Sequence, residues 1–275
     1  MGTSVIVSDK YFLHKRSQKI FDFKIGIERY LAEGSLLHGQ HIASVRNRCV
    51  ECHGQDLGGR RIIDHLGSGV IVSPNISPRK LDRWSNDDIA TLLRMGVKPD
   101  GTAVVMMPVY ETQHLSAQDI ASLIIWLRSV PPVTGIEPKI SPGPFLTIPF
   151  ALGVFPAFMP AESGIIRKKK VYQPYLEPQI SPTYGSYLAR TSCVACHGLT
   201  LKGGWIPGLP RNWPKAKDIT KTGIGSWSEE EFVATMKSGI NPAGIPFKVH
   251  GTPEIKKNFY DLELRALYLY LSGVP

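Results

Sequence analysis

The sequence predicts a mainly α-helical protein made of two tandem domains that are joined by a linker rich in proline and glycine. Three observations support this prediction. A Cys-x-x-Cys-His motif occurs twice, at 49–53 and at 193–197, 144 positions apart. Segments with helical periodicity and capping signals recur at nearly the same offset. The stretch between the two copies is interrupted repeatedly by proline and glycine.

These observations divide the chain of 275 residues into four parts. Each helical domain would contain about 100 residues, which is an ordinary size for one domain. The expected parts are an N-terminal extension (1–30), a first domain (31–132), a linker (133–180) and a second domain (181–275).

Each predicted domain begins with a helical segment directly before its cysteine motif. SLLHGQHIASVRNR precedes the first motif, and SPTYGSYLART precedes the second. The two motifs contain all four cysteines of the chain. Cys-x-x-Cys-His is typical of covalent haem c attachment. Two intervening residues bring both thiols to one edge of the porphyrin, and the following histidine presents its imidazole to the iron. We therefore expect two covalently attached haem c groups, one held by Cys49, Cys52 and His53 and the other by Cys193, Cys196 and His197.

Three other uses of the cysteine pairs explain the pattern less well. A single four-cysteine zinc site would leave the histidine after each pair as a coincidence that occurs twice. Redox dithiols of the thioredoxin type need a preceding strand and a βαβ unit, whereas helical segments precede both motifs. Disulfides across two residues would close almost no loop and would constrain the chain very little.

A capped helix follows each motif. WSNDDIATLLRMGVKPDG (84–101) aligns without gaps with WSEEEFVATMKSGINPAG (227–244), at an offset of 143. In both copies a serine is followed three residues later by an acidic residue, which is the capping-box pattern, and a glycine marks the end of the helix. The sequence therefore predicts N-caps at Ser85 and Ser228.

A terminal helix closes each domain. LSAQDIASLIIWLRSVP (115–131) resembles FYDLELRALYLYLSGVP (259–275), at an offset of 144. Ser116 and Asp119 suggest another capped start. Aromatic and leucine residues at helical spacing predict that each helix packs on its own domain.

The second axial ligand of each iron largely determines what a haem protein does. In the first domain the candidate is Met107, in a loop before a proline, and the adjacent Met106 is its rival. In the second domain the offset of 143 places His250 at the position of Met107. Lys248 and an open iron are the alternatives there. The other histidines, among them His38 and His41, are expected at the surface or in helix packing.

With these residues assembled, residues 30–275 resemble the dihaem cytochromes c built from two fused class I cytochrome c domains. The resemblance rests on CVECHG with a following DLGG, on SPNISP (73–78), on the helix that begins WS with acidic residues, and on LSAQDI before WLRSVPP. TYGSYLARTSCVACHG and TGIGSWSEEEF repeat the pattern in the second half. It implies two class I cytochrome c-like folds, each wrapped around one covalent haem c. His250 departs from the family's usual methionine.

The resemblance also implies an electron carrier that serves a dehydrogenase, an oxidase or a larger cytochrome assembly. Haem c is attached on the outer side of the cytoplasmic membrane, so a periplasmic or extracellular location is expected, although no signal peptide is visible. A methionine ligand raises the potential relative to a second histidine. We therefore expect a His/Met haem of high potential in the first domain and a bis-His haem of lower potential in the second, with electrons favoured to pass from the second to the first.

The composition of the chain limits the classes of molecule that it is expected to bind. The formal net charge is +9, which favours a redox partner with an acidic surface. No nucleic-acid motif accompanies this charge, and no stretch has the roughly 18 apolar residues of a membrane helix. Residues 1–30 offer a route to oligomers.

The sequence favours an electron carrier over an enzyme. The alternatives are a haem oxidoreductase that acts on a small sulfur or peroxide substrate at the second haem, and a subunit of a multi-haem conducting assembly.

Overall fold

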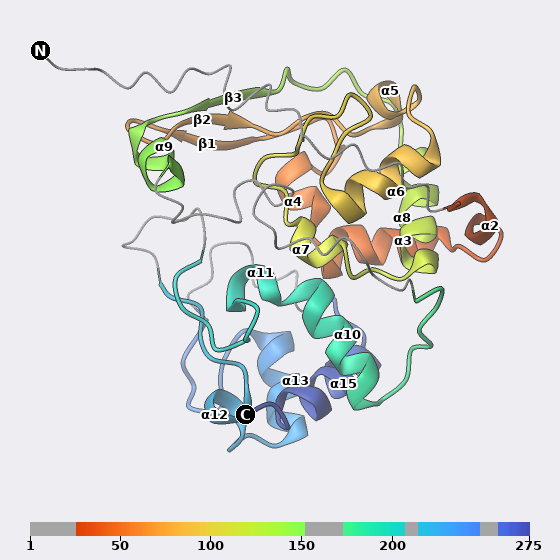
Figure 1. The fold of residues 1–275 in the computed structure, drawn as a ribbon. Helices are drawn as coiled ribbons and strands as arrows, with labels where there is room; N and C mark the ends of the chain where they lie inside the picture. The colour runs from red at the N-terminus through yellow and green to blue at the C-terminus, as the bar shows by residue number, and fades with distance from the viewer. Residues whose placement is uncertain (1–25, 152–172, 207–213, 248–257) are drawn as a thin grey trace, which may run out of the picture.

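The computed structural model describes residues 26–151, 173–206, 214–247 and 258–275, and it is mainly helical, as predicted (Figure 1). In order along the chain, the elements are α2 (Glu28–Leu31), α3 (Leu36–His41), the π-helix η1 (Ile42–Arg46), α4 (Cys49–His53), β1 (Arg61–His65), β2 (Gly69–Val72), α5 (Pro78–Leu81), α6 (Asn86–Met95), α7 (Val109–Thr112), α8 (Ala117–Ser129), β3 (Lys139–Pro142), α9 (Pro144–Ala151), α10 (Pro182–Ser192), α11 (Val194–His197), α12 (Lys221–Ile224), α13 (Glu229–Ser238) and α15 (Asp261–Leu271).

The buried hydrophobic side chains form two clusters, which lie in the upper and lower lobes of Figure 1. The first cluster draws on residues from Ile27 to Leu127, and the second draws mainly on residues from Tyr184 to Leu271. In each lobe the helix before the cysteine motif packs across the terminal helix: α3 against α8, and α10 against α15. Val45 of the first half is buried in the second cluster, so the two lobes share a packed boundary.

A glycine allows each of these helix pairs to cross closely. A Cβ atom added at Gly39 would lie 2.0 Å from the carbonyl oxygen of Ser122. One added at Gly185 would lie 1.9 Å from the carbonyl oxygen of Ala266. Both separations are far shorter than real atoms allow, so only glycine fits at either crossing. Neither glycine was predicted from the sequence to have this role.

We expect Gly39→Ala and Gly185→Ala each to lower the free energy of unfolding by about 1–3 kcal/mol or more, because the added methyl group must push two helices apart. Denaturant unfolding of the haem-loaded protein measures this change. Gly273→Ala is the matched control, since its Cβ would have no neighbour closer than 3.5 Å. Equal stability of all three variants would contradict the assignment of Gly39 and Gly185 as crossing points.

The π-helix η1 accommodates an insertion in the first half. The crossing glycines are 146 positions apart, whereas the motifs are 144 apart, so the first half has two extra residues between its glycine and its first cysteine. The wider turn of η1 is closed by the N–H of Asn47, which donates to the carbonyl of Ile42 at 2.8 Å. Arg48 then takes a left-handed backbone conformation, with φ of 52°, directly before the motif.

The predicted helix caps are confirmed. Ser85 and Asp88 form a complete capping box at the start of α6, and Ser228 and Glu231 form its counterpart at α13. Each of these helices ends at a glycine with a left-handed backbone. Ser116 caps α8 by accepting a hydrogen bond from the N–H of Asp119. The repeat found in the sequence is therefore also a repeat of local structure.

A small antiparallel sheet, in the order β1-β2-β3, adds to the first lobe and was not predicted. Its third strand comes from the segment expected to be a linker, and Ile140 pairs there with Ile71 of β2. Helix α9 follows at once, and the N–H of Phe145 donates to the carbonyl of Gly67 in the β1–β2 turn. Residues 139–151 are therefore attached to the first lobe by regular structure.

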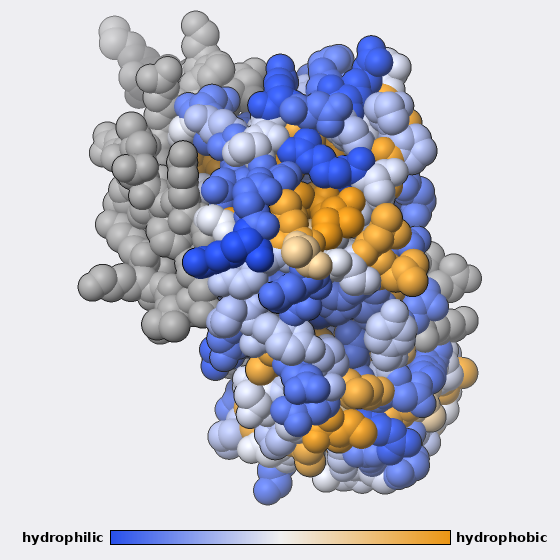
Figure 2. Space-filling model, turned by 90° about the vertical axis from the view of Figure 1, so that its right-hand side faces the viewer, coloured by the Kyte–Doolittle hydropathy of each residue, from blue (hydrophilic) through white to orange (hydrophobic). Residues whose placement is uncertain are grey.

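Figure 2 shows hydrophilic residues over much of one face of the described chain, with apolar residues gathered in separate patches on both lobes. Within the described ranges, no helix combines the length and the apolar character needed to cross a membrane.

Candidate haem sites

The two cysteine motifs occupy equivalent short helices at the ends of α3–η1 and α10. Each is followed by a loop of the same shape. Leu57 and Leu201 both take a left-handed conformation, with φ of 59° and 61°. The N–H of Gly59 donates to the carbonyl of His53 at 2.8 Å, and the N–H of Gly203 donates to that of His197 at 2.9 Å. Both histidines are thus presented from matching backbones.

Each motif histidine is oriented by a hydrogen bond from its inner ring nitrogen. Nδ1 of His53 contacts the carbonyl oxygen of Pro74 at 2.9 Å, and Nδ1 of His197 contacts that of Lys217 at 2.7 Å. A carbonyl can only accept, so Nδ1 carries the proton and Nε2 keeps the lone pair that a metal binds. Burial also lowers the pKa of His53, which favours the neutral imidazole. Both histidines therefore meet the requirements of an axial ligand of iron.

The cysteines fit covalent attachment better than the competing uses. All four are described, and none of them forms a disulfide. The described ranges contain no group of three or more His, Cys, Asp or Glu arranged for a metal ion, so the cysteines do not form one zinc site. Burial raises the pKa of the Cys49 thiol to about 12, which is opposite to the shift of a reactive dithiol.

Of the candidates for the second axial ligand, the two methionines lie within the described residues and His250 and Lys248 do not. Met107 lies in the loop before α7 and packs, partly buried, against the first hydrophobic cluster. Met106 takes a left-handed conformation, with φ of 60°. His250 and the rival Lys248 lie outside the described residues.

The second motif lies at the boundary between the lobes, where α7 of the first half lies against α10 and α11 of the second (Figure 1). The carboxylate of Glu111 on α7 accepts the N–H of Ala195, inside the second motif, at 2.8 Å. The guanidinium of Arg48 lies 3.8 Å from Sγ of Cys196. Neither residue was identified from the sequence. The only signal would have been the position of Arg48, next to Cys49.

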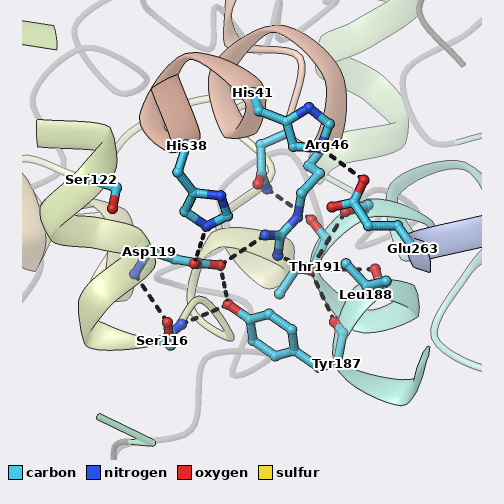
Figure 3. Close-up of polar contacts among 12 residues, drawn as sticks. His38, His41, Arg46, Ser116, Asp119, Ser122, Tyr187, Leu188, Thr191 and Glu263 are labelled. Carbon is cyan, nitrogen blue, oxygen red and sulfur yellow. Dashed lines mark hydrogen bonds and ion pairs between the residues drawn. The ribbon is translucent and has the colours of Figure 1, made fainter. Parts of the chain in front are cut away.

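A buried polar network joins the lobes beside the motifs (Figure 3). Arg46, whose side chain is 1% exposed, forms an ion pair with Asp119 at 3.0 Å. Tyr187 of the second half and His38 of the first also contact the Asp119 carboxylate. Burial alone would raise the pKa of Asp119, but the charge of Arg46 and the contacts with His38 and Tyr187 outweigh burial and lower that pKa well below its usual range. Asp119 is therefore an anion within the interface.

The network has a counterpart across the same boundary. Asp119 and Glu263 occupy the same position of their terminal helices, 144 residues apart. Asp119 contacts Tyr187 on α10 of the second half, and Glu263 contacts His41 on α3, the equivalent helix of the first half, at 2.8 Å. Tyr187 and His41 are themselves 146 positions apart, as are the crossing glycines. The halves thus associate much as two copies do around a twofold axis.

The structure refines the expectation for two histidines. His41 is buried and joins the halves through Glu263, so it has a packing role that extends beyond its own domain. His38 contacts Asp119 of its own half at 2.8 Å, which is helix packing as expected.

Residues 37–127 match the family model described as "Cytochrome C oxidase, cbb3-type, subunit III". Residues 37–127 therefore belong to the cytochrome c family. The matched residues include the first motif, its loop and most of the terminal helix α8.

Relatives match most of the chain. It is 29% identical to "Alcohol dehydrogenase (quinone), cytochrome c subunit" of Gluconobacter oxydans, a match that covers 88% of this chain and 55% of that protein. It is 26% identical to "Fructose dehydrogenase cytochrome subunit" of Gluconobacter japonicus, with coverage of 86% and 52%. The chain thus spans about half the length of these curated relatives. Reduced recombinant cytochrome c4 from Pseudomonas stutzeri matches 88% of this chain and all of its own chain at 14% identity, but the TM-score of 0.22 is too low to support any statement.

Proposed function

We propose that this cytochrome carries electrons with two covalent haem c groups, one on each cysteine motif. The observation that carries the proposal is the pair of equivalent histidines, His53 and His197, each held by a backbone carbonyl at Nδ1. Each bound haem iron would supply a one-electron ferric/ferrous couple. The cysteines of each motif would form the thioethers, and the histidines would provide the proximal ligands.

The second axial ligands in this proposal are Met107 for the first haem and His250 for the second. The packing of Met107 against the first hydrophobic cluster favours it over Met106, which the cluster does not include. For His250 the support is its offset of 143 from Met107. A thioether favours the ferrous state more than an imidazole does, so the first site would have the higher potential.

We further propose that the partner is a dehydrogenase on the outer side of the cytoplasmic membrane. The relatives are cytochrome subunits of an alcohol dehydrogenase and a fructose dehydrogenase, which supports this class of partner. A net charge of +9 would steer the chain toward an acidic docking surface, and added salt would weaken the association.

The mass of the intact chain, purified from cells that attach haem c, tests the proposal. We expect the mass of the polypeptide plus two haem groups for the unaltered chain, and plus one haem for the Cys193→Ala/Cys196→Ala variant. A Leu199→Ala variant, altered at an exposed side chain in the same loop, should keep both. A wild-type chain with one haem, or with none, would contradict the proposal.

A further inference from the structure

A charged cluster from the first half lies against the second cysteine motif. It consists of Arg48, Glu51 and Glu111. The guanidinium of Arg48 lies 3.8 Å from Sγ of Cys196 and 3.7 Å from the carboxylate of Glu51. Glu111 is 2% exposed and holds the N–H of Ala195. The second Glu51 oxygen is buried without a hydrogen-bond partner.

Arg48 reaches this position because of its backbone. It follows the π-helix η1 and takes the left-handed conformation directly before α4. From there its guanidinium contacts both Glu51 of α4 and Cys196 of the other half. Its charge also acts on Cys52, which is the repeat equivalent of Cys196. One cation therefore acts on the second cysteine of both motifs, and it contacts the sulfur of Cys196 directly.

A buried charge next to a haem changes its potential, since reduction adds one electron and Coulomb interactions are strong where water is excluded. A cation stabilises the ferrous state and raises the potential, and a carboxylate does the reverse. Burial opposes the charged form of Arg48, but the carboxylates of Glu51 and Glu111 favour it and raise the pKa of Arg48. Arg48 therefore remains a cation at every relevant pH.

We propose that Arg48, which belongs to the first half, raises the reduction potential of the haem of the second half through its positive charge. That haem is the one at Cys193, Cys196 and His197. Glu111 acts on the same haem in the opposite direction. This inference rests on the proposed function, because it requires a haem on the second motif.

Redox titration of Arg48→Gln, followed by EPR so that each haem is monitored by its own signal, tests the inference. The signal that is missing from Cys193→Ala/Cys196→Ala identifies the second haem. At a fixed ambient potential we expect the ferrous-to-ferric ratio of the second haem to fall about tenfold, equivalent to about 59 mV for one electron. The first haem should shift in the same direction by less. Arg48→Lys, which keeps the charge, should restore most of the potential.

Arg61→Gln is the matched control, because it removes one positive charge from an exposed pair on the same half. It should leave both potentials unchanged. Glu111→Gln, measured at about pH 8, should raise the potential of the second haem, because burial raises the pKa of Glu111 only to about 7 and the wild-type side chain is ionised at that pH. The Glu111→Gln variant also tests the inference on its own if Arg48→Gln fails to fold.

Two haems whose potentials are unmoved by both Arg48→Gln and Glu111→Gln, or moved as little as by Arg61→Gln, would overturn this inference alone. A wild-type chain without a second haem would instead overturn the proposed function.

Discussion

The Arg46→Ala variant is expected to lose about 3–5 kcal/mol of unfolding free energy. Removal of the guanidinium leaves the Asp119 carboxylate buried with one fewer compensating charge, and it also empties the space of a side chain that is 1% exposed (Figure 3). Denaturant unfolding of the haem-loaded protein measures the loss. Because Asp119 and Tyr187 lie in different halves, we also expect the variant to unfold in two steps, one for each half.

Arg61→Ala provides the comparison for this result. Arg61 pairs with Asp64 at the surface, where both side chains are more than half exposed, and such pairs contribute about 0.2–1 kcal/mol. If Arg46→Ala lowered the free energy of unfolding no more than Arg61→Ala does, this would contradict the claim that the buried network joins the halves.

The Met107→Ala variant is expected to lower the potential of the first haem strongly. Axial ligands change haem potentials over a range of about 0.8 V, and loss of the thioether removes the ligand that favours the ferrous state. We expect at least a tenfold fall in the ferrous-to-ferric ratio of the first haem at a fixed ambient potential, about 59 mV for one electron. The second haem should be unaffected.

Met106→Ala is the matched control, since it removes a methionine from the adjacent position. It should leave both haems unchanged. The reverse result, in which Met106→Ala lowers the potential and Met107→Ala does not, would assign the thioether ligand to Met106.

Features that depend on neighbouring residues could be predicted from the sequence. The caps at Ser85 and Ser228 are formed with acidic residues three positions away, so their pattern is complete within four residues. The motifs are equally local, because Cys-x-x-Cys-His contains both thiols and the imidazole. Because these helical and cysteine patterns recur at a nearly constant offset, they also predicted a mainly helical architecture with two similar halves.

Features that depend on contacts between distant segments could not be predicted. Asp119 stands three residues after Ser116 and so resembles a capping partner, yet its carboxylate contacts Arg46, which is 73 positions away in the sequence. Strand β3 pairs with β2 across more than 60 residues, and proline and glycine around it suggested a linker. The π-helix η1 lies between the crossing glycines, which are 146 positions apart, and the motifs, which are 144 apart, and no local signal marks either glycine as a crossing point.

Near-infrared magnetic circular dichroism together with EPR, recorded on the fully oxidised protein, tests the central claim most directly. That claim is that His53 and His197 each hold a haem, with Met107 completing the first site and His250 the second. The account predicts two low-spin haems in equal amounts, one with a His/Met signature and one with a bis-His signature. A high-spin signal from the second haem would contradict the assignment of His250 and would favour an open iron that can bind a small substrate.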